Sequence, residues 1–368
     1  MSHKIYALPE YPCTEDMWDK LAKETRSIVV YGMGNGADKL ILRFEKYGIK
    51  ISDFFASDGF VRGHEFHGMR VKSFSEIKAE YEDFVIALSF ASSRPEVLEM
   101  LAEINSEREM YIPDMPVAGD EYFDKDFYNS NYADIVKAYN ALADERSRST
   151  FAAIINYKLT GKMEYLEGAY SEKNEMYSIL SKRDVKTYVD AGAYNGDTLR
   201  EAMDSFGGLE RAYLVEPDPK NFKKLAKFIE NIEQIETKLY NAAVWSESGI
   251  GDFSTSGNRN SSVNSTKSYQ NKTAEIPLVA IDEIADGEID YIKYDVEGAE
   301  YEALVGSDRV IREYSPTLLV SLYHRSKDIF FLINYLAERY GEKYEFHLLR
   351  LRCVPAWEIN LIAYLKNI

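Results

Sequence analysis

The sequence contains very little cysteine and no long apolar run. Its two cysteines, Cys13 and Cys353, lie 340 residues apart, without a CxxC pair or a Cys/His cluster. This pattern excludes a disulfide scaffold and a zinc ribbon, and it fits a reducing compartment. No apolar run approaches 18 residues, and the N-terminus lacks the apolar segment of a signal peptide. We therefore expect a cytoplasmic protein without a membrane span.

Basic residues are scarce relative to acidic ones. The 368 residues include 44 Lys and Arg against 61 Asp and Glu, which gives a formal net charge of −17. A nucleic-acid binder must neutralise phosphates, so this charge argues against nucleic acid as a partner. The 45% hydrophobic and 29% charged residues are an ordinary globular composition, and the length predicts two or three domains.

Hydrophobic periodicity divides the chain into three parts. Residues 1–118 alternate short apolar strands with helices, which predicts a small α/β domain with a parallel sheet. Residues 119–184 are rich in aromatic, charged and helix-forming residues, which predicts a helical connector too apolar to be a disordered linker. A longer alternation of strands and helices predicts a second, larger α/β domain over residues 185–368.

In this last part we expect eight strands and four helices. The strands are predicted at 185–190, 211–216, 237–243, 275–280, 290–295, 317–323, 344–351 and 358–365. The helices are predicted at 196–206, 219–231, 298–306 and 326–340. The stretch 246–273 is rich in Ser, Asn, Thr and Gly, and such a long polar insertion is usually a binding loop or disordered when empty. A solvated surface loop is the alternative interpretation.

The strongest sign of a functional site in the sequence is a glycine loop between a strand and a helix. The strand ends at Asp190, and the chain turns through Gly192 and Gly196 into a helix whose first N–H groups are free to bind a ligand. Glu216 ends the next strand, where a carboxylate can accept both ribose hydroxyls of an adenosine ligand. Tyr194 replaces the middle glycine of a dinucleotide motif, which disfavours the close approach of a pyrophosphate. The acidic Asp190 would also repel phosphate, so we expect a cationic ligand group beside it. A tight turn without a ligand is the alternative.

Charged side chains gather at the ends of two later strands. Lys293, Asp295, Glu297 and Glu300 bracket a strand-to-helix turn at Gly298. Capping of the next helix is the alternative role for Glu297 and Glu300. The following strand ends at His324 and Arg325. A lone histidine is more often structural, but beside Asp295 at the same sheet edge His324 becomes a candidate proton acceptor.

Together these segments resemble the FkbM-type methyltransferases, a branch of the class I fold that uses S-adenosylmethionine. The resemblance runs from about 185 to 368 and rests on VDAGAYNGDT, YLVEPDPKNFKKL, NAAVWSESG, VAIDEI, YIKYDVEGAEYEALVG and SLYHR, in that order. DVEGAE is the most distinctive of these motifs. DERSRSTFAAIINYKLTG in the connector is similar to a segment that precedes this domain in bacterial two-domain members, while Tyr194 departs from the Asn of many members. The resemblance implies a Rossmann-like, class I methyltransferase-type sheet with helices on both faces.

This resemblance also implies an O-methyltransferase that acts on a hydroxyl of a sugar, nucleotide-sugar or glycan-linked acceptor. S-adenosylmethionine is then expected against Asp190, Gly192, Ala193, Tyr194 and Gly196, with its ribose on Glu216 and its adenine between Asn241 and Ala242. The expected catalytic residues are Asp295 and His324, and the expected acceptor-binding residues are Glu297, Arg259 and Arg325. Asp295 or His324 would take the proton of the acceptor, or a Mg²⁺ ion held by Asp295 would lower the pKa of its hydroxyl. Metal use is left open.

The first part of the chain carries a second glycine motif. Gly32 and Gly34 belong to a GxGxxA loop between a strand and a helix, and Asp58 follows the next strand. This pattern is a nucleotide-binding fingerprint, so these three residues form a candidate nucleotide site. The region resembles small nucleotide-binding-like domains of bacterial sugar-modifying enzymes, which hold a nucleotide-sugar or serve as scaffold and dimer contact. A homo-oligomer is therefore left open.

Two other functions stay open at this point. The first is an NAD-dependent oxidoreductase that uses the GxGxxA loop, although residues 1–118 offer no obvious acid or base for hydride transfer. The second is a non-enzymatic nucleotide-sugar-binding module with a degenerate C-terminal domain. The intact Asp190, Glu216 and Asp295 argue against such degeneracy.

Overall fold

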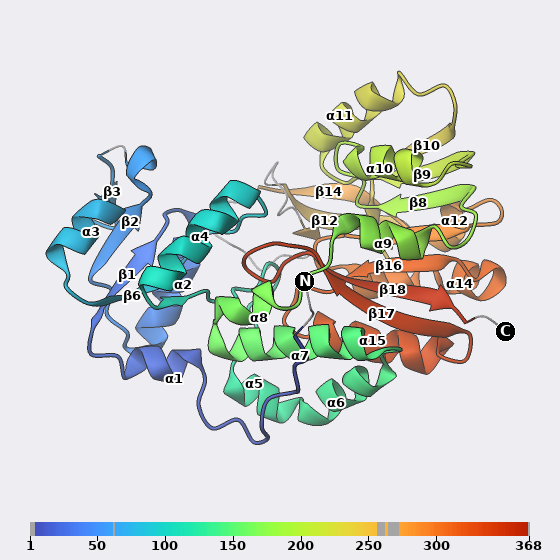
Figure 1. Cartoon of the computed structure of the whole chain (residues 1–368). Coiled ribbons are helices and arrows are strands. Elements are labelled where there is room, and N and C mark those ends of the chain that lie inside the picture. Colours follow the sequence, from blue (N-terminus) through green and yellow to red (C-terminus); the bar gives the residue numbers. More distant parts are fainter. Residues whose placement is uncertain (1–3, 62, 256–261, 264–271, 367–368) are drawn as a thin grey trace.

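The computed structural model describes residues 4–61, 63–255, 262–263 and 272–366 (Figure 1). Two sheets with mainly parallel strands stand side by side in Figure 1, and helices α5 to α8, within residues 125–167, lie between and below them. The mixed α/β fold is therefore confirmed. Among the described residues, no helix combines the length and the apolar character needed to cross a membrane.

The smaller sheet is built from short strands, most of them buried. Its order is β5 (Lys72–Ser73), β2 (Asp53–Ala56), β1 (Ser27–Tyr31), β6 (Phe84–Leu88) and β7 (Met110–Tyr111), all parallel. Helices α1 (Met17–Ala22) and α2 (Asn35–Tyr47) pack on one face, and α3 (Phe74–Glu80) and α4 (Pro95–Glu107) pack on the other. A small hairpin, β3 (Glu65–Phe66) and β4 (Met69–Arg70), follows β2. The sheet has the Rossmann-like form that the sequence predicts.

The connector is helical, as its composition predicts. Its helices are α5 (Lys125–Ser130), α6 (Tyr132–Ala141), α7 (Glu145–Thr160), α8 (Met163–Glu167) and α9 (Lys173–Leu180). Helix α7 is buried almost all round, and Lys158 on it makes a buried ion pair with Asp114. One continuous apolar core contains residues of the smaller sheet, of α7 and of the larger sheet. The connector thus joins the two sheets as packed structure rather than as a linker.

The larger sheet has seven strands. Its order is β10 (Glu236–Tyr240), β9 (Arg211–Val215), β8 (Thr187–Ala191), β15 (Tyr291–Tyr294), β16 (Thr317–Ser321), β18 (Ile359–Leu365) and β17 (Tyr344–Arg350). Only β18 runs against its neighbours. Helices α9, α10 (Asp197–Ser205) and α11 (Pro219–Ile229) cover one face. Helices α12 (Ile281–Ile284), α13 (Glu300–Val305), α14 (Asp308–Tyr314) and α15 (Asp328–Tyr340) cover the other.

The polar stretch after β10 differs from the prediction. We expected a strand at 275–280 in the main alternation and a loop over 246–273. Instead β14 (Lys272–Val279) belongs to a separate sheet, in the order β11 (Ala243–Val244), β14, β12 (Gly249–Thr255) and β13 (Ser262–Val263). β12 pairs antiparallel with β14 from Gly249–Leu278 to Thr255–Lys272. The Gly, Ser and Thr of β12 carry a turn signal that this pairing overrides.

Candidate active site

A cavity lies at the carboxyl ends of β8, β9, β15 and β16, where a ligand of a parallel α/β sheet is expected. Its volume is about 240 Å³. Gly192, Tyr194, Glu216, Asp295 and Glu297 line it, so the structure brings these five predicted residues together. Lys173, Met176 and Tyr177 from α9 add a wall that the sequence did not assign to the site.

The glycine loop after β8 depends on a backbone conformation that favours glycine. Gly192 has a φ of 92°, and a Cβ there would lie 2.0 Å from the carbonyl oxygen of Asp295. A glycine is therefore required where the loop passes the end of β15. Tyr194 takes a left-handed φ of 48°, the conformation that a glycine would adopt at this position. The substitution thus keeps the shape of the loop and places an aromatic ring on the cavity wall.

Glu216 holds the other side of this loop. Its Oε2 accepts the N–H of Tyr194 at 2.9 Å, and its Oε1 accepts the N–H of Asp218 at 2.8 Å. Burial raises the pKa of the Glu216 carboxyl to about 7. Each carboxylate oxygen has a second lone pair for a hydroxyl donor, so the predicted ribose contact fits this geometry.

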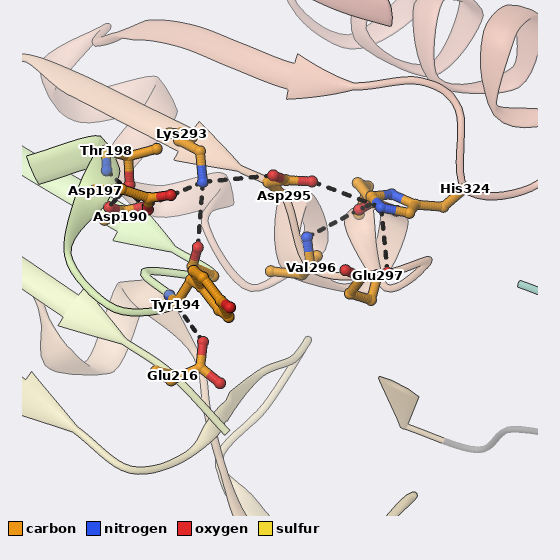
Figure 2. A network of polar contacts seen from close by, with 12 residues as sticks. Asp190, Tyr194, Asp197, Thr198, Glu216, Lys293, Asp295, Val296, Glu297 and His324 are labelled. Carbon is orange, nitrogen blue, oxygen red and sulfur yellow. Dashed lines mark hydrogen bonds and ion pairs between the residues drawn. The ribbon is translucent and has the colours of Figure 1, made fainter. Parts of the chain in front are cut away.

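Lys293 connects the glycine loop with the next strand end (Figure 2). Its Nζ lies 3.1 Å from Asp190 Oδ1, 3.2 Å from the carbonyl oxygen of Gly192 and 3.7 Å from Asp295 Oδ2. Burial works to lower the pKa of Lys293, but the Asp190 and Asp295 carboxylates outweigh it and hold that pKa above its usual value. The sequence motif included Lys293, but we assigned it no role.

Asp190 is engaged behind the loop rather than turned to a ligand. It is fully buried, receives Lys293 and accepts a hydrogen bond from the Thr198 hydroxyl. This corrects the expectation of a cationic ligand group beside Asp190, because Lys293 already neutralises the carboxylate. Asp197 and Glu201 are carboxylates that do line the cavity.

Four side chains meet at the ends of β15 and β16 (Figure 2). His324 Nε2 lies 3.6 Å from Asp295 Oδ1 and 3.5 Å from Glu297 Oε2, and its Nδ1 lies 2.9 Å from Glu300 Oε1. The Tyr323 hydroxyl donates to Asp295 Oδ1 at 3.1 Å. Asp295 and His324 are therefore neighbours, as their positions at one sheet edge predict.

The charge state of this group differs from the expectation. Burial works against a charged imidazole, yet the Glu300, Glu297 and Asp295 carboxylates raise the pKa of His324 to about 10. Burial raises the pKa of Glu297 to about 8. Burial also opposes the ionisation of Asp295, but Lys293 and His324 keep its pKa below the usual value. With these charges Asp295 is ionised and His324 protonated at neutral pH, so of the two side chains only Asp295 has a free base to offer.

Glu300 and Arg325 shape the turn between β15 and α13. Glu300 Oε1 accepts the N–H groups of Val296 at 3.0 Å and Gly298 at 3.4 Å. Arg325 Nε donates to the carbonyl oxygen of Gly298 at 2.7 Å. Arg325 is thus committed to the backbone of this turn, and the structure does not place it on the cavity wall as an acceptor-binding residue.

The other residues predicted in this domain fall in two groups. Ala193, Gly196, Asn241 and Ala242 lie beside the cavity wall rather than on it, while Ala243 and Val244 line it. The Asn241 amide instead donates to the carbonyl oxygens of Glu216 and Pro217. Arg259 lies outside the described residues.

The N-terminal motif has the predicted loop, but its carboxylate is engaged. Gly32 and Gly34 have φ values of 111° and 97° at the start of α2. Asp58 Oδ1 accepts the N–H of Ser75 at 3.1 Å, and its Oδ2 accepts the Ser75 hydroxyl. Nucleotide binding at this motif stays a prediction.

The strand order of the larger sheet, with one reversed strand and a cavity at the carboxyl edge, defines a class I methyltransferase fold. Residues 190–346 match the family model described as the methyltransferase FkbM domain. The chain therefore contains a methyltransferase domain of the FkbM family, and both strand-end clusters lie inside it.

A solved structure of a methyltransferase agrees with this fold. The crystal structure of a methyltransferase FkbM from Methylobacillus flagellatus KT shares 20% identity, covers 98% of this chain and 94% of its own, and superposes with a TM-score of 0.66. At that identity the likeness shows the fold alone. An rRNA methylase from Streptococcus thermophilus shares 13% identity, covers 54% of this chain and 98% of its own, and has a TM-score of 0.36, which supports no conclusion. No curated protein matches the chain.

Proposed function

We propose that the protein transfers a methyl group from S-adenosylmethionine to a hydroxyl of a sugar, nucleotide-sugar or other glycan-linked acceptor. The observation that carries this proposal is a single cavity lined both by the ribose-type carboxylate Glu216 and by the ionised Asp295. A cytoplasmic location and a homo-oligomer remain predictions beside it.

The charge of the cavity wall suits a cationic cofactor. Six carboxyl groups and two lysines line the cavity, and Glu297 is the one of the six whose raised pKa keeps it mainly protonated at neutral pH. Glu216 has free lone pairs that can accept hydrogen bonds from the two ribose hydroxyls. The loop of Gly192 and Tyr194 lines the part of the cavity where the methionine end of the cofactor would lie. The excess of negative charge stabilises a sulfonium more than a neutral ligand.

Asp295 is placed to take the proton of the acceptor. Methyl transfer is an in-line displacement: the acceptor oxygen forms a bond to the methyl carbon, the carbon–sulfur bond breaks, and the sulfur keeps that electron pair. The hydroxyl proton passes to Asp295, whose ionised form is stabilised by Lys293 and His324. The protein contributes mainly alignment and exclusion of water, which account for much of the acceleration in such a reaction.

Methyl transfer can be tested in cells and with purified protein. Glycans of cells that lack the protein should be lighter by one CH₂ unit at the acceptor sugar, as measured by mass spectrometry, and purified protein should restore the methyl group from labelled S-adenosylmethionine. Unchanged glycans together with no transfer of label to any hydroxyl acceptor would contradict the proposal.

A further inference from the structure

The cavity has a second end, on the side of Asp295 away from Glu216. Along the carboxyl edge of the larger sheet the strands follow in the order β9, β8, β15, β16 and β18. Glu216 follows β9, Asp295 follows β15 and Glu358 directly precedes β18, and all three line the cavity. Because β18 runs antiparallel to β16 and pairs Asn360 with Ser321, its first residues lie at this same edge. Asp295 therefore lies between a carboxylate on the cofactor side and a carboxylate on the other side.

Glu358 is held in a backbone conformation that is unfavourable for a residue with a side chain. Its φ is 59°, in the left-handed region. Its carbonyl oxygen accepts the N–H of Leu351 and the side-chain amide of Asn360, each at 3.0 Å. The loop before it is tied to the smaller sheet, because Ser92 and Val354 exchange backbone hydrogen bonds of 2.7 and 2.9 Å. Such strain persists only where the surrounding structure fixes it, and it is frequent at ligand sites.

The space between Asp295 and Glu358 suits a single ring. Neighbouring strands are about 4.8 Å apart, so the ends of β15 and β18 are separated by about 10 Å. Tyr323 follows β16, the strand between them, and lines the cavity while its hydroxyl donates to Asp295 Oδ1 at 3.1 Å. Burial, and then the carboxylates of Asp295 and Glu358, raise the pKa of Tyr323, so both carboxylates face the same part of the cavity. One sugar ring with a hydrogen bond on each side fills such a distance.

The lysines of the cavity wall are already engaged by carboxylates. Among the described residues that line the cavity, two are lysines and none is an arginine or a histidine. Lys173 pairs with Glu201, and Lys293 lies against Asp190 and Asp295. A phosphate or carboxylate on the acceptor would have to compete with these partners, and like charges brought together are costly. A carboxylate on the wall instead accepts hydrogen bonds from hydroxyl or ammonium groups.

We propose that Glu358 binds the acceptor at the end of the cavity opposite to Glu216, and that it accepts hydrogen bonds from the hydroxyl or ammonium groups of a neutral or amino sugar. Another hydroxyl of the same ring then lies at Asp295, which takes its proton. This inference rests on the proposed function and narrows it, because an acceptor ring that carries a phosphate or a carboxylate does not suit this wall.

Binding of three sugars to the full chain tests the subsite. Glucose, glucosamine and glucuronic acid share one type of ring and are neutral, cationic and anionic at neutral pH. Their dissociation constants are measured by saturation-transfer NMR in the presence of excess S-adenosylhomocysteine. Glucose or glucosamine should bind at least tenfold more tightly than glucuronic acid. A clear preference for glucosamine over glucose would assign an ammonium group to Glu358, and similar constants would assign hydroxyl groups.

Glu358→Gln removes the charge of the subsite with little change in size. This variant should weaken binding of the preferred sugar at least tenfold and reduce the discrimination against glucuronic acid, because hydrogen bonds to a charged acceptor are lost. Glu342→Gln is the matched control, since Glu342 is exposed and precedes β17 at the opposite edge of the sheet. Equally tight binding of glucuronic acid, no binding of any of the three sugars, or equal effects of the two substitutions would overturn the inference.

Affinity for S-adenosylhomocysteine separates this inference from the proposed function, and it should be unchanged in Glu358→Gln. A wild-type protein that binds S-adenosylhomocysteine but none of the sugars would lose the subsite and keep the methyltransferase. Sugar binding that depends on Glu358, in a protein that does not bind S-adenosylhomocysteine, would support the subsite and contradict the proposed function.

Discussion

At the scale of single residues, Lys293 shows how the buried charges of the site depend on one another. Its ammonium is buried between Asp190 and Asp295, at 3.1 and 3.7 Å, and Asp190 is fully buried. A buried carboxylate is tolerated only while a partner compensates its charge. The lysine therefore supports the fold and the ionised state of Asp295 together.

Removing this lysine should destabilise the protein. Lys293→Met leaves Asp190 buried and uncompensated, so we expect a loss of about 3–5 kcal/mol in the free energy of unfolding. Urea denaturation measures it. Adding Asp190→Asn to Lys293→Met should restore most of the lost stability, because the uncompensated charge is then gone. An equal loss in the single and the double variant would show that packing, not charge, is responsible.

Glu216 should make cofactor binding depend on pH. Its pKa is raised by burial to about 7, and the ribose hydroxyls need an ionised acceptor. Affinity for S-adenosylhomocysteine should thus rise as the pH increases toward 7 and level off above it. Calorimetry between pH 5.5 and 8 measures the trend, and Glu216→Gln should flatten it.

The same carboxyl affects stability with the opposite sign. Because the folded pKa lies above the unfolded value of 4.5, protonated Glu216 contributes stability below that value. This contribution is lost as the pH rises through about 7. A Glu216→Gln protein should lack that part of the pH dependence in thermal unfolding, and an unchanged profile would exclude the assigned pKa.

Replacing Asp295 should lower the rate of the reaction far more than the affinity for the cofactor. Asp295→Asn removes the proton acceptor, so kcat should fall by about 10²–10⁴-fold while affinity for S-adenosylhomocysteine stays nearly constant. Tyr323→Phe removes only one hydrogen bond to this carboxylate and is the milder control. Equal losses of affinity and rate in Asp295→Asn would instead make Asp295 a cofactor or folding residue.

At the scale of elements, the turn after β8 is fixed by steric limits. The Cβ of Gly192→Ala would lie 2.0 Å from the Asp295 carbonyl oxygen, at a φ of 92°. We expect the free energy of unfolding to fall by about 1–3 kcal/mol. We also expect a large drop in cofactor affinity, because the loop must move away from the end of β15 to avoid the clash. Gly207→Ala is the matched control, since a Cβ there meets nothing within 4 Å. Equal effects of the two substitutions would argue against this close approach.

Most of the elements around the site could be predicted from the sequence. β8, β9, β15 and β16 are short, largely apolar runs, and the first three are followed directly by a glycine or a carboxylate; this pattern indicates buried parallel strands. β12 could not be predicted, because its Gly, Ser and Thr have little strand preference and its pairing with β14 supplies the structure. Helix α13 begins later than expected because Glu300 holds a turn at Gly298.

The chemistry of the site could be predicted only in part. The positions of Glu216, Asp295 and His324 follow from strand ends, which meet at one edge of the sheet. The charge of His324 and the burial of Asp190 depend on partners from other elements, and sequence order alone does not reveal them. Lys293 offered a usable signal, since a lysine inside a buried strand requires carboxylate partners.

At the scale of the whole molecule, the connector and the N-terminal part belong to the structure of the site. Helix α9 forms one wall of the cavity. The N–H of Ala118 donates to the carbonyl oxygen of His324 at 2.8 Å, and the Ser326 hydroxyl donates to the carbonyl oxygen of Glu121 at 2.5 Å. The segment that follows the smaller sheet thus supports the strand end that carries His324. The division at 118 and 184 remains a prediction, because one core crosses it.

A fragment of residues 185–368 should therefore fail to fold cooperatively. It loses α7 and α9, whose apolar side chains pack against the larger sheet. Circular dichroism should show a broad thermal transition for the fragment and a sharp one for the full chain. A fragment that unfolds sharply and binds S-adenosylhomocysteine like the full chain would contradict this account of the connector.

The central claim is that one cavity binds S-adenosylmethionine through Glu216 and aligns it with Asp295. Calorimetric titration of S-adenosylhomocysteine into the full chain tests this claim most directly. We predict one site per chain, weakened about 10–100-fold in Glu216→Gln because hydrogen bonds to a charged acceptor are lost. A folded wild-type protein that does not bind S-adenosylhomocysteine would contradict the account.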